Sequence, residues 1–161
     1  MNPEQDASIK IDLTDQAATE RLAGRIAALA RKGDILALHG DLGTGKTVFA
    51  RAFVRALCGP QTEVPSPTFT LLQVYPADQA DIYHFDLYRL EQPQEAFELG
   101  LDEAFADGIC LIEWPERLGY LQPAECLNLA FAYGTNDIQR TLALTGSGDW
   151  ADRLREAHLA A

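Results

Sequence analysis

The pattern of hydrophobic and polar positions in the first third of the chain predicts two strands and two helices. Alternation along residues 8–13 is typical of a strand with one buried face. Apolar residues then recur at helical spacing, and we expect a helix that begins after an N-cap at Thr14 and ends near Arg31. Its apolar stripe consists of Ala18, Leu22, Ile26 and Leu29. The short apolar run at residues 34–39 predicts a buried strand, and residues 46–57 predict the second helix.

The rest of the chain mixes short apolar runs with short helical patterns. We expect strands at residues 69–75, 81–86, 108–113, 125–133 and 138–144, with the last two paired as a hairpin. We expect short helices at residues 93–99 and 102–105, a helical turn opened by Pro115, and a terminal helix at residues 149–160 capped by Asp149. Because buried and alternating strands both occur, the pattern indicates an α/β sandwich with a mixed sheet.

Length and charge narrow the class of protein. A chain of 161 residues is expected to form one domain. Lys and Arg total 13 against 24 Asp and Glu, which gives a net charge of −11. A surface of this sign is poorly suited to holding nucleic acid, because phosphate contacts need a basic patch. We therefore expect any RNA to be held by a partner protein, although an acidic surface can equally serve solubility alone.

The sequence also argues against membrane, disulfide and zinc chemistry. No stretch approaches about 18 uninterrupted apolar residues, so no membrane span is expected. The polar, acidic N-terminus lacks the regions of a signal peptide, and we expect a cytoplasmic protein. The three cysteines, Cys58, Cys110 and Cys126, include no C-x-x-C pair, so we expect them to be reduced and mostly buried. The three histidines are scattered along the chain.

Residues 40–47 complete the phosphate-binding pattern G-x-x-x-x-G-K-S/T between the predicted strand and the predicted helix. The glycines let successive backbone N–H groups point at phosphate oxygens, and the helix N-terminus adds a favourable dipole. Lys46 can reach the β- and γ-phosphates, and the Thr47 hydroxyl can ligate Mg²⁺. We expect ATP to contact Asp41, Leu42, Gly43, Thr44, Gly45, Lys46, Thr47 and Val48. The fold class is then that of a P-loop NTPase, a three-layer sandwich around a mixed, largely parallel sheet. A chance glycine loop is the less favoured alternative.

Hydrolysis also needs an acidic group near Mg²⁺ and a group that orients water. Asp86 and Glu113 each end a predicted apolar strand, where a side chain at the carboxyl edge of a sheet lies beside the P-loop. Either carboxylate can contact the metal, directly or through water, and the other can orient the attacking water. We therefore assign catalysis to Asp86, Glu113 and Lys46, and the metal to Thr47, Glu113 and Asp86. The alternative is that both acids are ordinary strand-end carboxylates.

Other candidates are less specific. Thr68 or Thr70 lies in the loop after the P-loop helix and can bond the γ-phosphate or its metal, although spacing alone favours a plain turn. Trp114 can lie over the nucleotide or pack in the core. Arg89 can approach a phosphate or form a surface ion pair. No N-K-x-D guanine-reading sequence occurs, which lowers a GTP-specific interpretation.

Five blocks, in this order, resemble the TsaE family, also called YjeE: GDLGTGKT at residues 40–47, SPTFT at 66–70, HFDLYR at 84–89, ELGL at 98–101 and IEWPE at 112–116. The similarity spans about residues 33–144. It implies a small bacterial ATPase with a P-loop α/β fold that serves the synthesis of N6-threonylcarbamoyladenosine in tRNAs reading codons that begin with A. In that family TsaD, with TsaB, transfers the threonylcarbamoyl group. TsaE binds the TsaB–TsaD complex, and its ATP hydrolysis supports turnover.

The resemblance also implies roles for individual residues. Thr47 and Glu113 look like Mg²⁺ ligands, with Asp86 close to the metal and the water. Residues 66–68 would form a switch-like loop, with Trp114 near the site. The tRNA would be held by TsaB and TsaD and would touch this chain only indirectly. Residues 146–161 match no block and are a possible C-terminal helical tail. No catalytic arginine can be assigned within the chain.

Two other functions remain open at this stage. A free-standing small-molecule kinase needs arginines that clamp the transferred phosphoryl group. The arginines after the P-loop helix are sparse: Arg89, Arg117, Arg140, Arg153 and Arg155. A nucleotide switch without turnover is the second alternative, and the presence of both Asp86 and Glu113 speaks against it.

Overall fold

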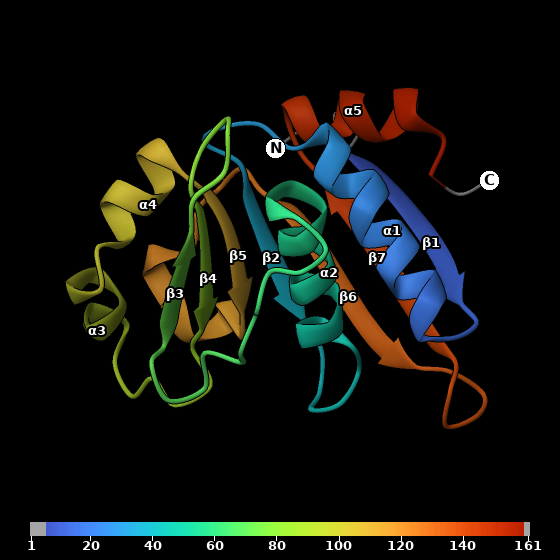
Figure 1. The fold of residues 1–161 in the computed structure, drawn as a ribbon, viewed down its shortest axis with the longest axis horizontal. Helices are drawn as coiled ribbons and strands as arrows, with labels where there is room; N and C mark the ends of the chain where they lie inside the picture. The colour runs from blue at the N-terminus through green and yellow to red at the C-terminus, as the bar shows by residue number, and fades with distance from the viewer. Residues whose placement is uncertain (1–5, 160–161) are drawn as a thin grey trace.

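The computed structural model describes residues 6–159, and its strands form one seven-stranded sheet (Figure 1). The strands are β1 (Ala7–Leu13), β2 (Ile35–His39), β3 (Leu72–Tyr75), β4 (Ile82–Asp86), β5 (Ile109–Glu113), β6 (Leu127–Tyr133) and β7 (Arg140–Gly146). The helices are α1 (Gln16–Leu29), α2 (Lys46–Cys58), α3 (Pro93–Glu98), α4 (Leu101–Asp107) and α5 (Asp149–Ala157), with a 3₁₀ segment η2 (Pro115–Leu121).

The strand order is β1-β7-β6-β2-β5-β4-β3. The four neighbouring strands β6, β2, β5 and β4 run parallel, whereas β1, β7 and β3 pair antiparallel toward the edges. The sequence-based prediction of an α/β sandwich with a mixed sheet is therefore confirmed. The central position of β2 matters for the site, because its carboxyl end lies beside that of β5, and β5 lies beside β4.

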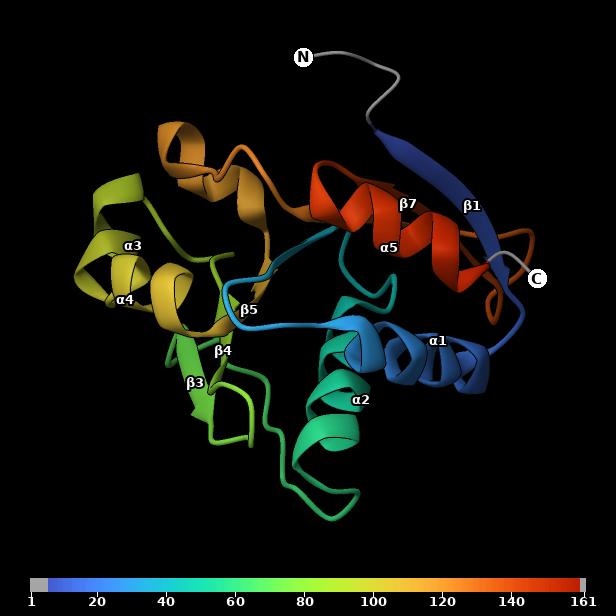
Figure 2. The same cartoon turned by 90° about the horizontal axis from the view of Figure 1, so that it is seen from above.

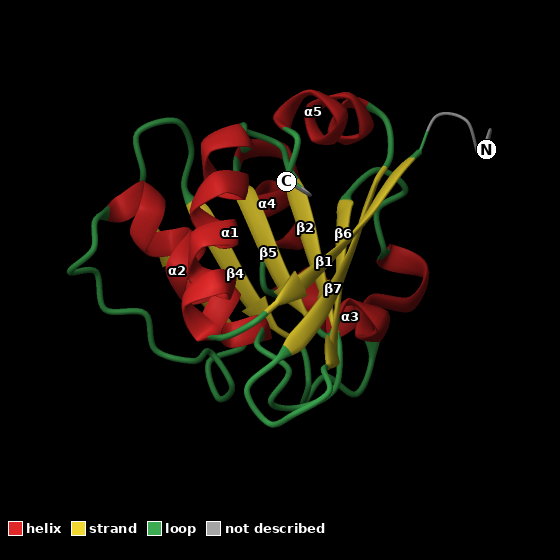
Figure 3. Ribbon diagram, turned by 90° about the vertical axis from the view of Figure 1, so that its right-hand side faces the viewer, coloured by secondary structure: helices red, strands yellow, loops and turns green. Residues whose placement is uncertain are grey.

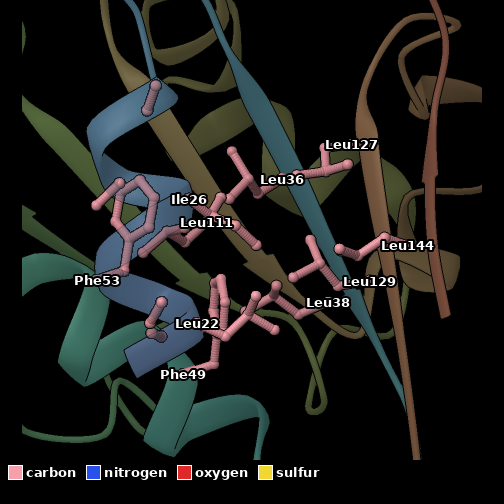
Figure 4. Close-up of a cluster of buried hydrophobic side chains, with 14 of the residues drawn as sticks. Leu22, Ile26, Leu36, Leu38, Phe49, Phe53, Leu111, Leu127, Leu129 and Leu144 are labelled. Atoms are coloured by element: carbon pink, nitrogen blue, oxygen red, sulfur yellow. The ribbon is translucent and has the colours of Figure 1, made fainter. Parts of the chain in front are cut away.

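Two apolar clusters fill the spaces on the two faces of the sheet and make three layers (Figure 2). Helices α1 and α2 cover one face. There, Phe49 and Phe53 of α2 pack against Leu36, Leu38 and other buried leucines of the sheet (Figure 4). Helices α3 and α4 and segment η2 cover the other face through Ala96, Leu101, Ala104 and Leu118. Burial of each large apolar side chain contributes about 1.5–3 kcal/mol, so the two clusters hold the layers together.

Helix α5 packs across the end of the sheet that lies opposite the P-loop (Figure 3). Trp150, Ala151 and Leu154 are buried in the cluster shared with α1. Arg153 forms a two-pronged contact with Asp34, at 2.7 Å and 2.8 Å to its two carboxylate oxygens. Asp34 directly precedes β2, so this ion pair ties the C-terminal helix to the start of the central strand.

Several predicted element ends differ from the observed ones for local reasons. The N-cap of α1 is Asp15 rather than Thr14, because the Asp15 carboxylate accepts a 2.9 Å hydrogen bond from the Ala18 N–H. Gly148, rather than Asp149, is the N-cap of α5, and that helix ends at Ala157, while residue 160 lies outside the described residues. Strand β3 begins at Leu72 rather than at residue 69, because Leu71 adopts a left-handed conformation with φ of 64°.

The other expectations concern cysteines and the membrane. Cys58, Cys110 and Cys126 are all free, and the latter two are buried, which confirms the prediction. Within residues 6–159, no helix combines the length and apolar character needed to cross a bilayer.

Candidate functional site

The P-loop connects the carboxyl end of β2 to the first turn of α2 and depends on glycine conformations. Gly40, Gly43 and Gly45 have φ of 140°, 78° and 110°, which side-chain-bearing residues rarely adopt. At Gly40 a Cβ would also lie 2.6 Å from the Phe131 carbonyl oxygen, so only glycine fits. Gly45 is the N-cap of α2, and no side chain caps this helix end. The amides of the first turn are therefore available to an anion.

The hairpin formed by β6 and β7 braces the P-loop from outside. The Tyr133 hydroxyl donates to the Leu42 carbonyl, and Arg140 Nη2 donates to the Gly43 carbonyl at 3.2 Å. The Arg140 guanidinium also lies 5.0 Å from the Tyr133 ring centroid. Sequence reasoning missed both bracing residues, because no local pattern relates a hairpin to a loop about 90 positions earlier.

Lys46 is almost fully buried at the base of the loop. Its ammonium donates to the Gly40 carbonyl and lies 3.4 Å from the centroid of the Trp114 ring. Burial lowers the pKa of Lys46, while the carboxylates of Glu113, Glu116, Asp86 and Asp41 act in the opposite direction. The half-buried Trp114 ring packs against the apolar cluster on the α3 and α4 face, and it also covers Lys46 and lines the cavity described below. Its position over a nucleotide stays a prediction.

Glu113 ends β5 and is only 2% exposed. Its Oε1 accepts a 2.8 Å hydrogen bond from the Thr47 hydroxyl, and its Oε2 lies 2.7 Å from His84 Nε2. The three histidines are scattered along the sequence, and the contact of His84 with Glu113 was not expected from it. The sequence contained part of this information, because His84 and Asp86 are two residues apart on one strand and therefore share a face of the sheet.

Asp86 ends β4 directly opposite Glu113 in the parallel register. Its carboxylate accepts hydrogen bonds from the Tyr88 N–H at 3.1 Å and from the Thr68 hydroxyl at 3.3 Å. Burial raises the pKa of Asp86 and the nearby Glu113 adds to this effect, whereas the two hydrogen bonds oppose it. Ser66 and Thr68 share a 2.7 Å hydrogen bond. Through Thr68, the loop predicted to act as a switch contacts Asp86, one of the candidate acids.

A cavity of about 470 Å³ brings most of these residues together, a size within the range of small-molecule sites. Its walls include the predicted residues Leu42, Gly43, Gly45, Lys46, Thr47, Val48, Thr68, Asp86 and Glu113. Asp41 and Thr44 do not line it; the Thr44 hydroxyl instead donates to the Asp41 carbonyl at 2.8 Å. Thr70 and Arg89 are also absent from its walls, and Arg89 stacks on the exposed Phe69 ring.

The far wall of the cavity was not anticipated from the sequence. It is built from the start of α1 and from the β6–β7 turn, through Asp15, Gln16, Thr19, Asp137 and Ile138. These residues and the two acids lie on opposite sides of the P-loop, because β6 and β5 flank β2 in the strand order of the sheet. A ligand larger than a phosphate chain can therefore extend along this wall.

The donor set suits Mg²⁺. The Thr47 hydroxyl and the Glu113 carboxylate touch, and Asp86 pairs with Glu113 on the neighbouring strand. All are oxygen ligands, which Mg²⁺ prefers, and Mg²⁺ takes few ligands from the protein when phosphates and water supply the rest. Among the described residues, no cluster of three or more His, Cys, Asp or Glu side chains forms a complete protein cage for a metal. The residues fit a magnesium ion shared with phosphates.

Residues 13–142, which include the whole of this cavity, match the family model described as threonylcarbamoyl adenosine biosynthesis protein TsaE. The chain belongs to the TsaE family. It is 46% identical over 109 residues to the tRNA threonylcarbamoyladenosine biosynthesis protein TsaE of Rickettsia conorii, covering 68% of this chain and 62% of that protein. It is 39% identical to the TsaE of Bacillus subtilis over 139 residues, covering 86% of this chain and 85% of that one.

A solved structure supports the same assignment. The crystal structure of Bacillus subtilis YdiB aligns with a TM-score of 0.78 at 32% identity, covering 94% of this chain and 93% of the other. The similarity therefore extends beyond the segment that matches the TsaE family model. The family's named role is in tRNA threonylcarbamoyladenosine biosynthesis.

Proposed function

We propose that this TsaE-family chain is a Mg²⁺-dependent ATPase that acts on the TsaB–TsaD complex during N6-threonylcarbamoyladenosine modification of tRNAs reading codons that begin with A. The observation that carries the proposal is the contact between Thr47 and Glu113 inside the P-loop cavity. Through this contact a carboxylate lies next to the P-loop, whereas a P-loop without such an acid only binds phosphates. Hydrolysis needs such an acid beside the metal position.

The residues of the chain can perform the positioning that phosphoryl chemistry requires. Free amides at the start of α2 and the Lys46 ammonium would bind the phosphates, because both present positive charge to the same end of the cavity. Thr47 and Glu113, with Asp86 beside them, would hold Mg²⁺, which neutralises charge on the β- and γ-phosphates when bound. The Asp86 or the Glu113 carboxylate can accept a hydrogen bond from the attacking water and so orient it.

The Ser66–Thr68 loop links the acids to a segment that can respond to the nucleotide. Thr68 contacts Asp86 and lines the cavity, so a γ-phosphate would compete for its hydroxyl. This arrangement supports a chain that adopts different loop positions with ATP and with ADP. Such a difference is what a partner complex needs in order to sense hydrolysis.

The acidic surface supports an indirect relation to tRNA. A net charge of −11 gives the chain little attraction for a phosphate backbone, so TsaB and TsaD would hold the tRNA while this chain binds the protein pair. A cytoplasmic location follows from this assignment. The kinase alternative gains no support, because within residues 6–159 Arg140 is the one arginine on the cavity wall and it is bonded to the P-loop.

The decisive experiment measures Mg²⁺-dependent ATP hydrolysis by the chain alone and with a matching TsaB–TsaD pair. We expect weak activity alone that rises with the pair, and a Lys46→Ala chain gives the background. Activity that ignores the pair would contradict the partner assignment. Transfer of phosphate to nucleosides or sugars, rather than to water, would support the kinase alternative instead.

A further inference from the structure

His84 occupies the middle of β4 and is fully buried. Alternation along the strand puts Ile82, His84 and Asp86 on one face, and the parallel register puts Glu113 on the same face of β5. His84 therefore reaches Glu113 diagonally across the sheet, at 2.7 Å from Nε2 to Oε2. It does not line the cavity, so it cannot act on the nucleotide directly.

The Glu113 carboxylate is held from two sides by two different elements. Thr47 of α2 donates to Oε1 at 2.8 Å, and His84 of β4 contacts Oε2. Only Oε1 therefore faces the P-loop helix. With both oxygens bonded, rotation of the carboxylate about its last side-chain bond would break at least one hydrogen bond in a buried setting, which is unfavourable.

The other ring nitrogen of His84 indicates which way the hydrogen bond runs. Within residues 6–159, Nδ1 has no hydrogen-bond partner and no solvent access. A proton on Nδ1 would leave a buried donor unsatisfied, so the neutral ring with its proton on Nε2 fits best. His84 then donates to Glu113 through Nε2, and its unprotonated Nδ1 stays a buried acceptor without a partner among residues 6–159.

We propose that His84 is a positioning residue for Glu113: it fixes Oε2 so that Oε1 is presented to Thr47 and to the metal position. This inference rests on the proposed ATPase function. It differs from a purely structural role, in which His84 would only satisfy a buried carboxylate. In the positioning role, loss of the hydrogen bond changes how well the chain uses Mg²⁺ even when the fold is intact.

The test compares His84→Leu, which removes the donor, with His84→Gln, whose amide can still donate. Ile82→Val serves as the matched control, because Ile82 is buried on the same strand and face but belongs to an apolar cluster and lies outside the cavity walls. For each chain we would measure thermal stability, binding of a non-hydrolysable ATP analogue at several Mg²⁺ concentrations, and kcat and KM for ATP. The binding series reports on the site independently of turnover.

We expect His84→Leu to lower kcat and to raise the Mg²⁺ concentration for half-maximal analogue binding, each by about 10–100-fold, as for other groups that orient a ligating carboxylate. Analogue binding without Mg²⁺ and the KM for ATP at saturating Mg²⁺ should stay close to those of the original chain. His84→Gln should recover much of the loss. Ile82→Val should lower the melting temperature and leave the Mg²⁺ dependence unchanged.

Three results would overturn the inference. One is a folded His84→Leu chain with the Mg²⁺ dependence and kcat of the original. Another is a folded His84→Gln chain as impaired as His84→Leu. The third is a loss that simply follows melting temperature across all three variants, Ile82→Val included. If the original chain binds the analogue with Mg²⁺ but hydrolyses no ATP, the proposed function fails, while the binding series still decides the role of His84.

Discussion

The Thr47 hydroxyl donates a 2.8 Å hydrogen bond to Glu113 Oε1, across 66 positions of sequence. The contact joins the first turn of α2 to the carboxyl end of β5, and it exists because β5 lies next to β2 in the sheet. A residue that merely ended a strand would face solvent, yet Glu113 is 2% exposed. The order of the strands thus places its carboxylate at the P-loop.

Glu113→Ala should leave nucleotide binding partly intact and stop turnover, with kcat lower by about 10²–10⁴-fold, the usual contribution of a group that assists proton transfer or orients water. Single-turnover ATP hydrolysis and analogue binding would measure the two effects separately. Glu103→Gln is the matched control, because Glu103 is an exposed glutamate of α4 that lies outside the cavity walls. Normal hydrolysis by Glu113→Ala would show that this acid is not needed.

Lys46→Ala should abolish ATP binding or hydrolysis without lowering the stability of the nucleotide-free fold. Burial lowers the pKa of Lys46, so its charged form is less favourable in the folded chain than in the unfolded chain. This cost is fully present below the folded pKa and is lost as the pH rises from the folded pKa to the higher pKa of the unfolded chain. Thermal melts at neutral pH would check the expectation, and a large drop in melting temperature would contradict it.

Nucleotide binding should change the fluorescence of Trp114. The Lys46 ammonium lies over its ring, a contact worth about 0.5–2 kcal/mol that phosphate oxygens must outcompete. The second tryptophan, Trp150, is buried in α5 at the other end of the sheet. Titration with an ATP analogue should therefore give a saturable signal that Trp150→Phe keeps and Trp114→Phe loses. A signal that survives in Trp114→Phe would come from Trp150 and would contradict the expected response of Trp114.

Asp86→Asn should raise the stability of the nucleotide-free chain at neutral pH while impairing turnover. Burial raises the pKa of Asp86, so the ionised carboxylate is disfavoured in the folded state. Its contribution to stability is present at low pH and is lost as pH rises through the folded pKa. The advantage of the asparagine variant should therefore shrink as the pH is lowered toward the ordinary aspartate pKa. Denaturant titrations at several pH values without Mg²⁺ would measure it, and a constant difference would contradict the assigned cause.

Arg153→Met should destabilise the chain by about 3 kcal/mol, because it leaves the Asp34 carboxylate without its charged partner in a nearly buried place. Activity per folded molecule should not change, since α5 lies far from the P-loop end of the sheet. Arg155→Met on the exposed side of the same helix should cost less than about 1 kcal/mol. Urea denaturation of both variants would measure the difference, and equal losses would show that the ion pair contributes little.

Local patterns predicted much of this molecule. The loop at residues 40–47 could be predicted because its glycines, lysine and threonine all lie within one short segment of sequence. Asp86 and Glu113 became candidates because each ends an apolar run. Left-handed Leu71, by contrast, gave no warning, since leucine rarely adopts that conformation, and the strand was predicted three residues too early.

Contacts between distant strands could not be predicted. His84 meets Glu113 only because β4 and β5 are neighbours in register, and strand order does not follow from the pattern of one chain. The same holds for Tyr133 and Arg140, whose bonds to the P-loop depend on β6 lying beside β2. Until the strand order is known, the sequence does not distinguish these three residues from others without a role at the site.

The ion pair between Arg153 and Asp34 has a practical consequence for experiments. It fixes α5 to the start of β2, while the P-loop leaves the other end of the same strand. A dye or surface linkage placed on an exposed position of α5, such as Glu156, would therefore be rigidly attached yet remote from the cavity. A chain immobilised in this way would keep its nucleotide site open, so ATP and partner proteins could be passed over it in turn.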